Sequence, residues 1–121
     1  VGVSRVGKTP TCLYLAVNYG IKSANYPFAE DDLKHDKLPK SLVPYHSKLF
    51  GLTINVDRLH RIRQNRIPGS SYADMNTCRS EIDAAEHIMR QYGIPFLNTS
   101  EKSIEEIASS IMQLIHLGRK F

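Results

Sequence analysis

The chain begins VGVSRVGKTP, and residues 2 to 9 fit the spacing G-x-x-x-x-G-K-T without a gap. This spacing is typical of a loop that joins a β-strand to an α-helix and surrounds a phosphate with backbone N–H groups. The required helix is present, because KTPTCLYLAVNY carries apolar residues at helical spacing and glycine follows it. The pattern predicts an anion-binding loop over residues 2–9 and a helix that runs to about Tyr19.

Each part of the loop has a chemical reason. Gly2 and Gly7 allow positive φ and leave no Cβ in the way of inward-facing N–H groups. Lys8 brings a compact charge to the outer phosphate oxygens, and Thr9 offers a hydroxyl to Mg²⁺. Arg5 is either a second cation for a transferred group or a solvated residue at the loop tip. The catalytic candidates are therefore Lys8, Arg5 and Thr9.

Two features depart from a standard loop of this kind. Pro10 follows the threonine at once, and proline has no N–H to lend to the innermost phosphate, although it is well tolerated in the first turn of a helix. We expect this phosphate to be held less firmly than usual. The motif also normally follows a β-strand, which here would lie before Val1, so we expect the chain to be part of a longer protein.

Strands and helices alternate along the rest of the chain. Strands are predicted at residues 21–28, 48–54 and 94–99, and helices at 56–66, 75–92 and from 104 onward. Asn55 is expected to cap the second helix, and Ser103 with Glu106 forms a capping box before the last one. The residues predicted to share the buried face of each helix are Val56, Leu59, Ile62 and the stem of Arg66 in helix 56–66, Cys78, Ile82, Ala85 and Met89 in helix 75–92, and Ile104, Ile107, Ala108, Ile111, Met112 and Ile115 in the last helix. Residues 29–46 read as a surface loop. The chain is thus predicted to be one α/β domain over residues 1–121, with the mostly parallel sheet and flanking helices of a P-loop kinase.

Composition limits the class of protein. Of 121 residues, 41% are hydrophobic, which is enough for one buried core. The 16 Lys and Arg residues against 12 Asp and Glu give a formal charge of +4, which favours anionic ligands without indicating nucleic acid. Cys12 and Cys78 lie far apart, so neither a disulfide framework nor a zinc site is indicated, and a reducing cytoplasm fits. No segment is apolar over the length of a membrane span.

Three further groups of residues have open roles. The first is basic and either closes over a phosphate or forms a solvated helix face: Arg58, Arg61, Arg63 and Arg66. The second is acidic and either supplies a base or metal-bound water, or is an exposed turn: Glu30, Asp31 and Asp32. The third lies in a predicted turn and either contacts the nucleotide or a partner, or only begins the next helix: Ser70, Ser71 and Tyr72.

Longer segments match a known family in order along nearly the whole chain. They are GVSRVGKTPTCLYLA, IKSANYPFAEDD, KLFGLTIN, RLHRIRQNR, SSYAD, EIDAAEHIMRQYGIPFLNT and SIEEIASSIM. The chain resembles the C-terminal half of the phosphoenolpyruvate synthase regulators, a family that includes the plant regulator of pyruvate, phosphate dikinase. The ANYPFAEDD segment resembles the synthase-regulating branch. One difference is Val56, where the family has proline after the asparagine or aspartate.

The resemblance implies a bifunctional enzyme. Such regulators transfer phosphate from ADP to a threonine beside the phosphorylated catalytic histidine of their target, and remove it with inorganic phosphate, which releases pyrophosphate. The family's nucleotide loop falls on Gly2, Val3, Ser4, Arg5, Val6, Gly7, Lys8 and Thr9. It implies ADP, phosphate and Mg²⁺ as ligands and phosphoenolpyruvate synthase as partner. A small-molecule P-loop kinase and a nucleotide-binding module without chemistry remain alternatives.

Overall fold

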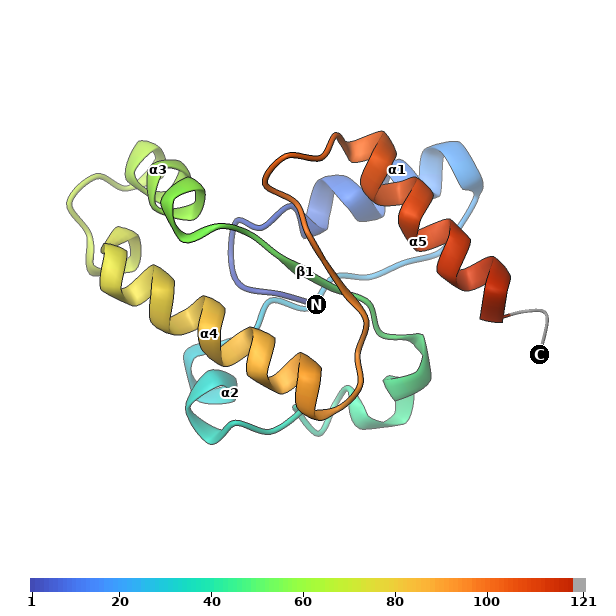
Figure 1. Ribbon diagram of the computed structural model, residues 1–121, viewed down its shortest axis with the longest axis horizontal. Coiled ribbons are helices and arrows are strands. Elements are labelled where there is room, and N and C mark those ends of the chain that lie inside the picture. The colour runs from blue at the N-terminus through green and yellow to red at the C-terminus, as the bar shows by residue number, and fades with distance from the viewer. Residues whose placement is uncertain (119–121) are drawn as a thin grey trace.

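The computed structural model describes residues 1–118 as a mixed α/β arrangement (Figure 1). The two named strands are β1 (Gly51–Thr53) and β2 (Phe96–Asn98). The helices are α1 (Lys8–Tyr19), α2 (Glu30–His35), α3 (Val56–Arg66), α4 (Met75–Gln91) and α5 (Ile104–Gly118), with short 3-10 helices η1 (Val43–Lys48) and η2 (Ser71–Ala73). In Figure 1, β1 runs through the centre, α1 lies with α5 on one side, and α3 lies with α4 on the other.

The sheet is parallel and positions the loop. β1 and β2 pair in parallel with Gly51 opposite Phe96. The first two residues lie along the other edge of β1, because the N–H of Leu52 donates to the carbonyl of Val1 at 2.8 Å. Gly2 in turn forms a parallel bridge with Pro27. The loop therefore leaves the carboxyl end of an extended segment that lies between two neighbours, which confirms the predicted strand-to-helix transition.

The predicted helices are confirmed where local signals were strong. α1 ends at Tyr19, and Gly20 follows in the left-handed conformation with φ of 65°. The capping box before α5 is formed, since Ser103 and Glu106 each accept the other's backbone N–H, at 3.1 and 3.0 Å. Asp74 caps α4 by accepting from two N–H groups of the first turn. These bonds satisfy donors that the helices themselves leave free.

Three expectations for the chain between α1 and α3 were wrong. Residues 21–28 form no regular strand and pair only at Pro27. Residues 29–46 are not a plain loop, because they contain α2 and most of η1. The side chain of Asp32 accepts the backbone N–H of Ala29 at 2.9 Å and so starts α2. Asn55 stands at the N-cap of α3 but makes no side-chain cap bond, because its Oδ1 accepts from Asn98 instead.

The core forms where the helices meet the strands. α4 contributes the predicted buried stripe of Cys78, Ile82, Ala85 and Met89. α5 buries Ile107, Ala108 and Ile111, while the predicted core position Ile115 lies outside the described side chains. Within residues 1–118, no helix has both the length and the apolar character needed to cross a membrane. The mixed α/β class is confirmed, whereas the layering of a P-loop kinase stays a prediction.

Candidate phosphate-binding site

The loop is a left-handed turn fixed at both ends. Gly7 takes φ of 109° and stands at the N-cap of α1, as predicted from its need for positive φ. Val3 and Val6 anchor the loop in the core, with 1% and 2% of their surface exposed. The positive φ expected at Gly2 was wrong, because Gly2 is not among the glycines with positive φ. A Cβ at Gly2 would lie 2.5 Å from the carbonyl oxygen of Leu52, so close approach of two backbones requires glycine there.

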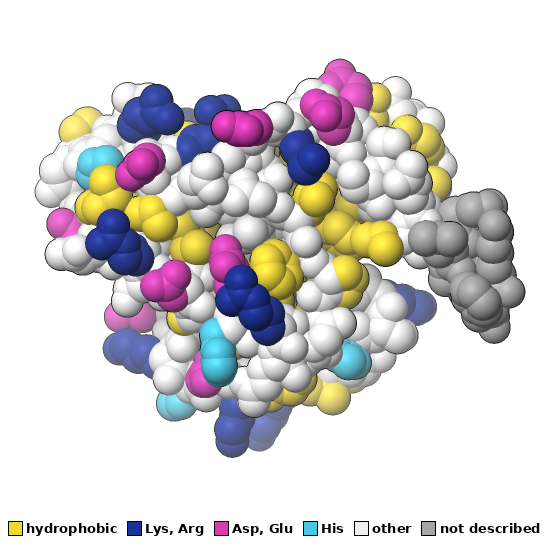
Figure 2. All heavy atoms as spheres, in the orientation of Figure 1, with side chains coloured by type: hydrophobic (Ala, Val, Ile, Leu, Met, Phe, Trp, Pro, Cys, Tyr) yellow, Lys and Arg dark blue, Asp and Glu magenta, His cyan; other side chains and the backbone are white. Residues whose placement is uncertain are grey.

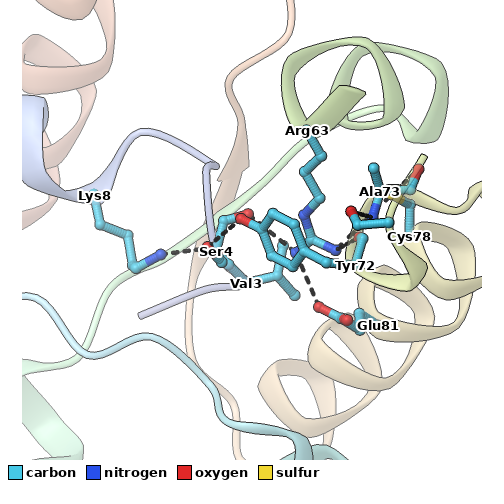
Figure 3. Close-up of polar contacts among 9 residues, drawn as sticks. Val3, Ser4, Lys8, Arg63, Tyr72, Ala73, Cys78 and Glu81 are labelled. Atoms are coloured by element: carbon cyan, nitrogen blue, oxygen red, sulfur yellow. Dashed lines mark hydrogen bonds and ion pairs between the residues drawn. The ribbon is translucent and has the colours of Figure 1, made fainter. Parts of the chain in front are cut away.

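Lys8 folds back into the loop. Its Nζ donates to the carbonyl oxygen of Val3 at 2.5 Å, and the residue is buried (Figure 3). Burial, followed by the charges of Arg63 and Arg5, lowers the pKa of Lys8 from 10.5 to about 8. The ammonium is therefore short of water and of negative partners, and an anion in the loop would supply the charge that it lacks.

A hollow of about 350 Å³ lies against the loop, and we call it the loop hollow. Its polar lining comes from Ser4, Arg5, Lys8 and Thr9 of the loop and from Asn25 across from them. Thr9, the second residue of α1, is exposed, and its hydroxyl accepts weakly from Nδ2 of Asn25 at 3.4 Å. The positive end of α1 and two side-chain cations meet here, so the loop hollow offers the charge and the donors that an anion would need.

Pro10 lies at the edge of the loop hollow, in the first turn of α1. The first backbone bond of the helix runs from the N–H of Thr11 to the carbonyl of Gly7 at 3.2 Å. Proline therefore removes no bond from the helix, and its fixed φ suits this turn. It does remove a donor that would otherwise face the loop hollow.

Arg63 is not a lid cation. Its side chain is fully buried, and Nη2 donates to the carbonyl oxygen of Ser4 at 3.1 Å and to Glu81 at 2.9 Å. Nη1 donates to the carbonyl oxygen of Tyr72 at 3.0 Å (Figure 3). The guanidinium thus ties the loop to α4 and to η2. We predicted that Arg66 shares the inner face of α3 with Leu59, but Leu59 and Arg63, one turn apart, occupy it.

Tyr72 reaches the loop from the turn before α4. Its hydroxyl is 2.6 Å from the hydroxyl of Ser4, and its ring lies 4.2 Å from the guanidinium carbon of Arg63. Tyr72 therefore contacts the loop itself, while contact of residues 70–72 with a nucleotide or a partner stays a prediction. Ser70 instead caps η2 by accepting the N–H of Ala73. Arg63, Tyr72 and Asn25 were not assigned to the loop from sequence, because each contact crosses a long sequence separation.

The remaining candidates divide by position. Asp32 accepts from the hydroxyl of Tyr26 at 3.1 Å besides capping α2, and Glu30 pairs with Lys34. In the described chain, neither they nor Asp31 line the loop hollow. Arg58, Arg61 and Arg66 are exposed. On the face shown in Figure 2, Lys and Arg side chains are interspersed with Asp and Glu side chains. The cations at the loop are thus distinguished by their placement rather than by a general positive surface.

Metal binding by protein ligands alone has no support in the described residues, which contain no group of three or more His, Cys, Asp or Glu side chains able to hold an ion. The loop fits a different arrangement. Thr9 offers one exposed hydroxyl oxygen at the hollow, and Mg²⁺ usually takes one or two protein ligands beside phosphate oxygens and waters. A Mg²⁺ ion that arrives with a nucleotide is compatible with this donor set.

Comparison with known proteins identifies the relatives of the chain. The model of the family described as kinase/pyrophosphorylase matches residues 1–112. Curated proteins of Laribacter hongkongensis and Neisseria meningitidis are each 56% identical over 121 residues, all of this chain and 44% of their own length. A protein of Dichelobacter nodosus is 51% identical over the whole chain and 45% of its own length. All three are provisionally named phosphoenolpyruvate synthase regulatory proteins.

The chain therefore spans less than half the length of these relatives. Which part of their length it matches stays a prediction. No solved structure matches the chain.

Proposed function

The chain belongs to the kinase/pyrophosphorylase family, and from this premise we propose that its protein regulates phosphoenolpyruvate synthase by reversible phosphorylation. In the inactivating direction, a threonine hydroxyl of the synthase attacks the β-phosphorus of ADP. The bond from that phosphorus to the bridging oxygen breaks, AMP leaves, and the hydroxyl proton passes to a base. In the reactivating direction, an oxygen of inorganic phosphate attacks the phosphothreonine, which releases pyrophosphate and the free threonine.

One observation carries this proposal: two side-chain cations and the N-terminus of α1 line the same hollow of about 350 Å³. Lys8 is held inside it by the carbonyl of Val3, and Arg5 lines the same space. Positioning and electrostatic stabilisation do most of the work in phosphoryl transfer. We propose that residues 1–121 form the nucleotide-binding and catalytic domain, in which Gly2 to Thr9 bind the diphosphate.

The proposed roles of the side chains follow from their placement. Lys8 moves from the carbonyl of Val3 to the terminal phosphate oxygens, where its charge has a better partner. Arg5 neutralises charge on the transferred group from the loop tip. Thr9 would hold a Mg²⁺ that arrives with the nucleotide, and that ion would offset negative charge on the phosphates. Ser4 is held in place by Tyr72 and Arg63, so the loop is shaped before the ligand binds.

A direct reconstitution tests the function. The full-length protein is mixed with ADP and with phosphoenolpyruvate synthase carrying phosphohistidine, and the synthase is examined for phosphothreonine by mass spectrometry. We expect one phosphothreonine per modified chain, with AMP formed in equal amount. Synthase without phosphohistidine is the control and should stay unmodified.

The same assay separates the other readings. Phosphoryl transfer from ATP to a metabolite, with none from ADP to the synthase, would make the protein a small-molecule kinase. Retained ADP binding with no phosphothreonine on any acceptor would make it a nucleotide-binding regulatory module. In the reverse direction, phosphorylated synthase and inorganic phosphate should yield pyrophosphate, and the release of inorganic phosphate alone would overturn the pyrophosphorylase half of the proposal.

A further inference from the structure

A second hollow lies next to the loop hollow and differs from it in chemistry. It has a volume of about 230 Å³, and we call it the side hollow. Its walls are mainly aliphatic, from the strand end after β1, from α3 and from the start of α5: Ile54, Ile62, Ile104 and Ile107. An aliphatic hollow beside a phosphate loop is suited to the apolar part of a ligand whose charged part lies in the loop.

The two hollows are joined through the loop itself. Arg5, Gly7 and Pro10 line both of them. Pro10 presents an apolar ring without an N–H at this junction, so one ligand can pass from polar to apolar surroundings across it. The side hollow is smaller than the roughly 300–1,000 Å³ typical of sites that hold a whole ligand. Its size fits one portion of a larger molecule.

The polar groups of the side hollow are of two kinds. The hydroxyl of Thr11 donates to the carbonyl of Gly7 at 2.7 Å, and the hydroxyl of Thr99 lies 3.0 Å from the carbonyl oxygen of Val6 and 3.2 Å from that of Thr53. Both hydroxyl protons thus have backbone acceptors within the protein. The other polar groups are the exposed cations Arg58 and Lys102, together with Arg5, which the side hollow shares with the loop hollow. A guanidinium and an ammonium can lie over the face of an aromatic ring or contact acceptor atoms on its edge.

We propose that the side hollow binds the nucleobase of the nucleotide whose phosphates occupy the loop hollow. A nucleobase is flat, aromatic and uncharged, so it gains from aliphatic walls and from nearby cations. A phosphate has better partners in the loop hollow, because Lys8 lines that hollow and not the side hollow. The inference rests on the proposed function, because it takes the loop as the diphosphate site. It adds which side of the loop the nucleoside occupies, and it leaves the side near Asn25 and Pro27 to the phosphoryl acceptor.

The test compares two ligands that differ only by the base: ADP and the base-free ribosyl diphosphate. Affinities for the full-length protein are measured by calorimetry for the wild type and for Ile62→Ala and Arg58→Ala. Ile67→Ala and Arg61→Ala are matched controls, because these two exposed residues belong to the same helix or its end but do not line the side hollow. Circular dichroism and thermal unfolding identify any variant that fails to fold.

We expect ADP to bind the wild type about tenfold or more tightly than the base-free ligand. Ile62→Ala should weaken ADP about threefold to tenfold, given the apolar area it removes, and should leave the base-free ligand within twofold. Arg58→Ala should act in the same direction, and the two controls should change neither affinity. Lys8→Ala should weaken both ligands, since both carry the diphosphate.

The outcomes separate the two proposals. If Lys8→Ala leaves both affinities unchanged, the loop is not the diphosphate site, and the proposed function fails. A second outcome is that Lys8→Ala weakens both ligands while folded Ile62→Ala and Arg58→Ala change the affinities for ADP and for the base-free ligand equally. In that case the loop remains the diphosphate site, and the base subsite is overturned. The base subsite is also overturned if these two variants weaken binding of the synthase while ADP affinity is unchanged, because the side hollow would then belong to the protein acceptor.

Discussion

The ammonium group of Lys8 donates a hydrogen bond to the carbonyl oxygen of Val3, 2.5 Å away, and closes the loop on itself. A single neutral carbonyl is a poor partner for a buried charge, so a phosphate in the loop hollow would replace it with a better one. This exchange gives the lysine a measurable share of the binding free energy.

Lys8→Ala should weaken ADP binding about tenfold to a hundredfold, because charge-assisted hydrogen bonds contribute roughly 1.5–3 kcal/mol. The fold should survive, since the substitution removes only one internal hydrogen bond, from Nζ of Lys8 to the carbonyl of Val3. Calorimetry measures the affinity, and circular dichroism checks the fold. Lys22→Ala is a control on an exposed lysine outside both hollows. Unchanged ADP affinity in a folded Lys8→Ala protein would mean that the nucleotide binds elsewhere.

ADP binding should depend on pH through Lys8. Its pKa in the free protein is about 8, so the cation that attracts phosphate is lost as the pH rises through this value. We expect the contribution of Lys8 to ADP affinity to be constant below about pH 7 and to fall above pH 8, by at most about tenfold per pH unit for one proton. Binding near pH 8 should take up protons, which calorimetry in buffers of different ionisation enthalpy detects. A Lys8→Ala protein with the same fall in affinity would assign the effect to another group.

The same pKa has a consequence of opposite sign for stability. Lys8 binds its proton more weakly in the folded chain, where the pKa is about 8, than in the unfolded chain, where it is near 10.5. The unfolded state therefore holds more protons between these values, and the contribution of Lys8 to the free energy of unfolding rises with pH across that window. Below about pH 8 the buried ammonium is a cost to folding, which fits a residue kept for binding.

The loop, the first helix and the capped helices could be predicted because their signals are local. Gly7, Gly20 and the pair Ser103 and Glu106 each act within a few residues of their own position. The burial of Arg63 could not be predicted, because the local sequence of a basic helix does not show which arginine faces water and which faces the core. What decides is Glu81 on α4 and the carbonyl of Ser4, which lie 18 and 59 residues away.

The segment between α1 and β1 shows the same limit. Residues 21–28 have the composition of a strand, yet their one bridge joins Pro27 to Gly2, where the N–H of Phe28 donates to the carbonyl of Gly2 at 2.9 Å. Asn55 illustrates a choice between partners. It has the right residue type and backbone conformation for a cap, but Nδ2 of Asn98, the last residue of the neighbouring strand β2, donates to its Oδ1 at 2.8 Å.

Gly2→Ala should destabilise the protein and disturb the loop. The new Cβ would meet a backbone oxygen at 2.5 Å and Cγ1 of Val6 at 3.0 Å, and overpacking of this kind costs about 1–3 kcal/mol. ADP affinity should fall as well, because the strain lies where the loop begins. Gly20→Ala is the control, since it adds strain at φ of 65° in open space at the far end of α1. It should lower thermal stability without changing ADP affinity, and an equal loss of affinity in both variants would contradict the local effect.

Arg63→Met should cost about 3–5 kcal/mol of unfolding free energy, because it leaves Glu81 without its buried partner. Tyr72→Phe, which removes only the hydroxyl contact to Ser4, should cost about 0.5–1.5 kcal/mol. Urea unfolding measures both. Arg66→Met on the exposed end of the same helix should stay within about 0.5 kcal/mol. A similar loss for Arg63→Met and Arg66→Met would show that the contacts of Arg63 contribute little.

Pro10→Ala tests why proline follows the loop, in the first turn of α1. Alanine restores an N–H at the edge of the loop hollow, in a helical turn where its φ is already suitable, and the new bond to a phosphate is worth roughly 0.5–1.5 kcal/mol. If the missing donor helps the site use a diphosphate as phosphoryl donor, the variant should bind ADP about twofold to tenfold more tightly and transfer phosphate more slowly. The added bond then stabilises the bound ground state without a matching gain in the transition state. If proline only stiffens the start of α1, the variant should lose a little thermal stability and keep both quantities. ADP affinity by calorimetry and the single-turnover transfer rate to the synthase decide between these outcomes, and a faster transfer rate in the variant contradicts the tuning role.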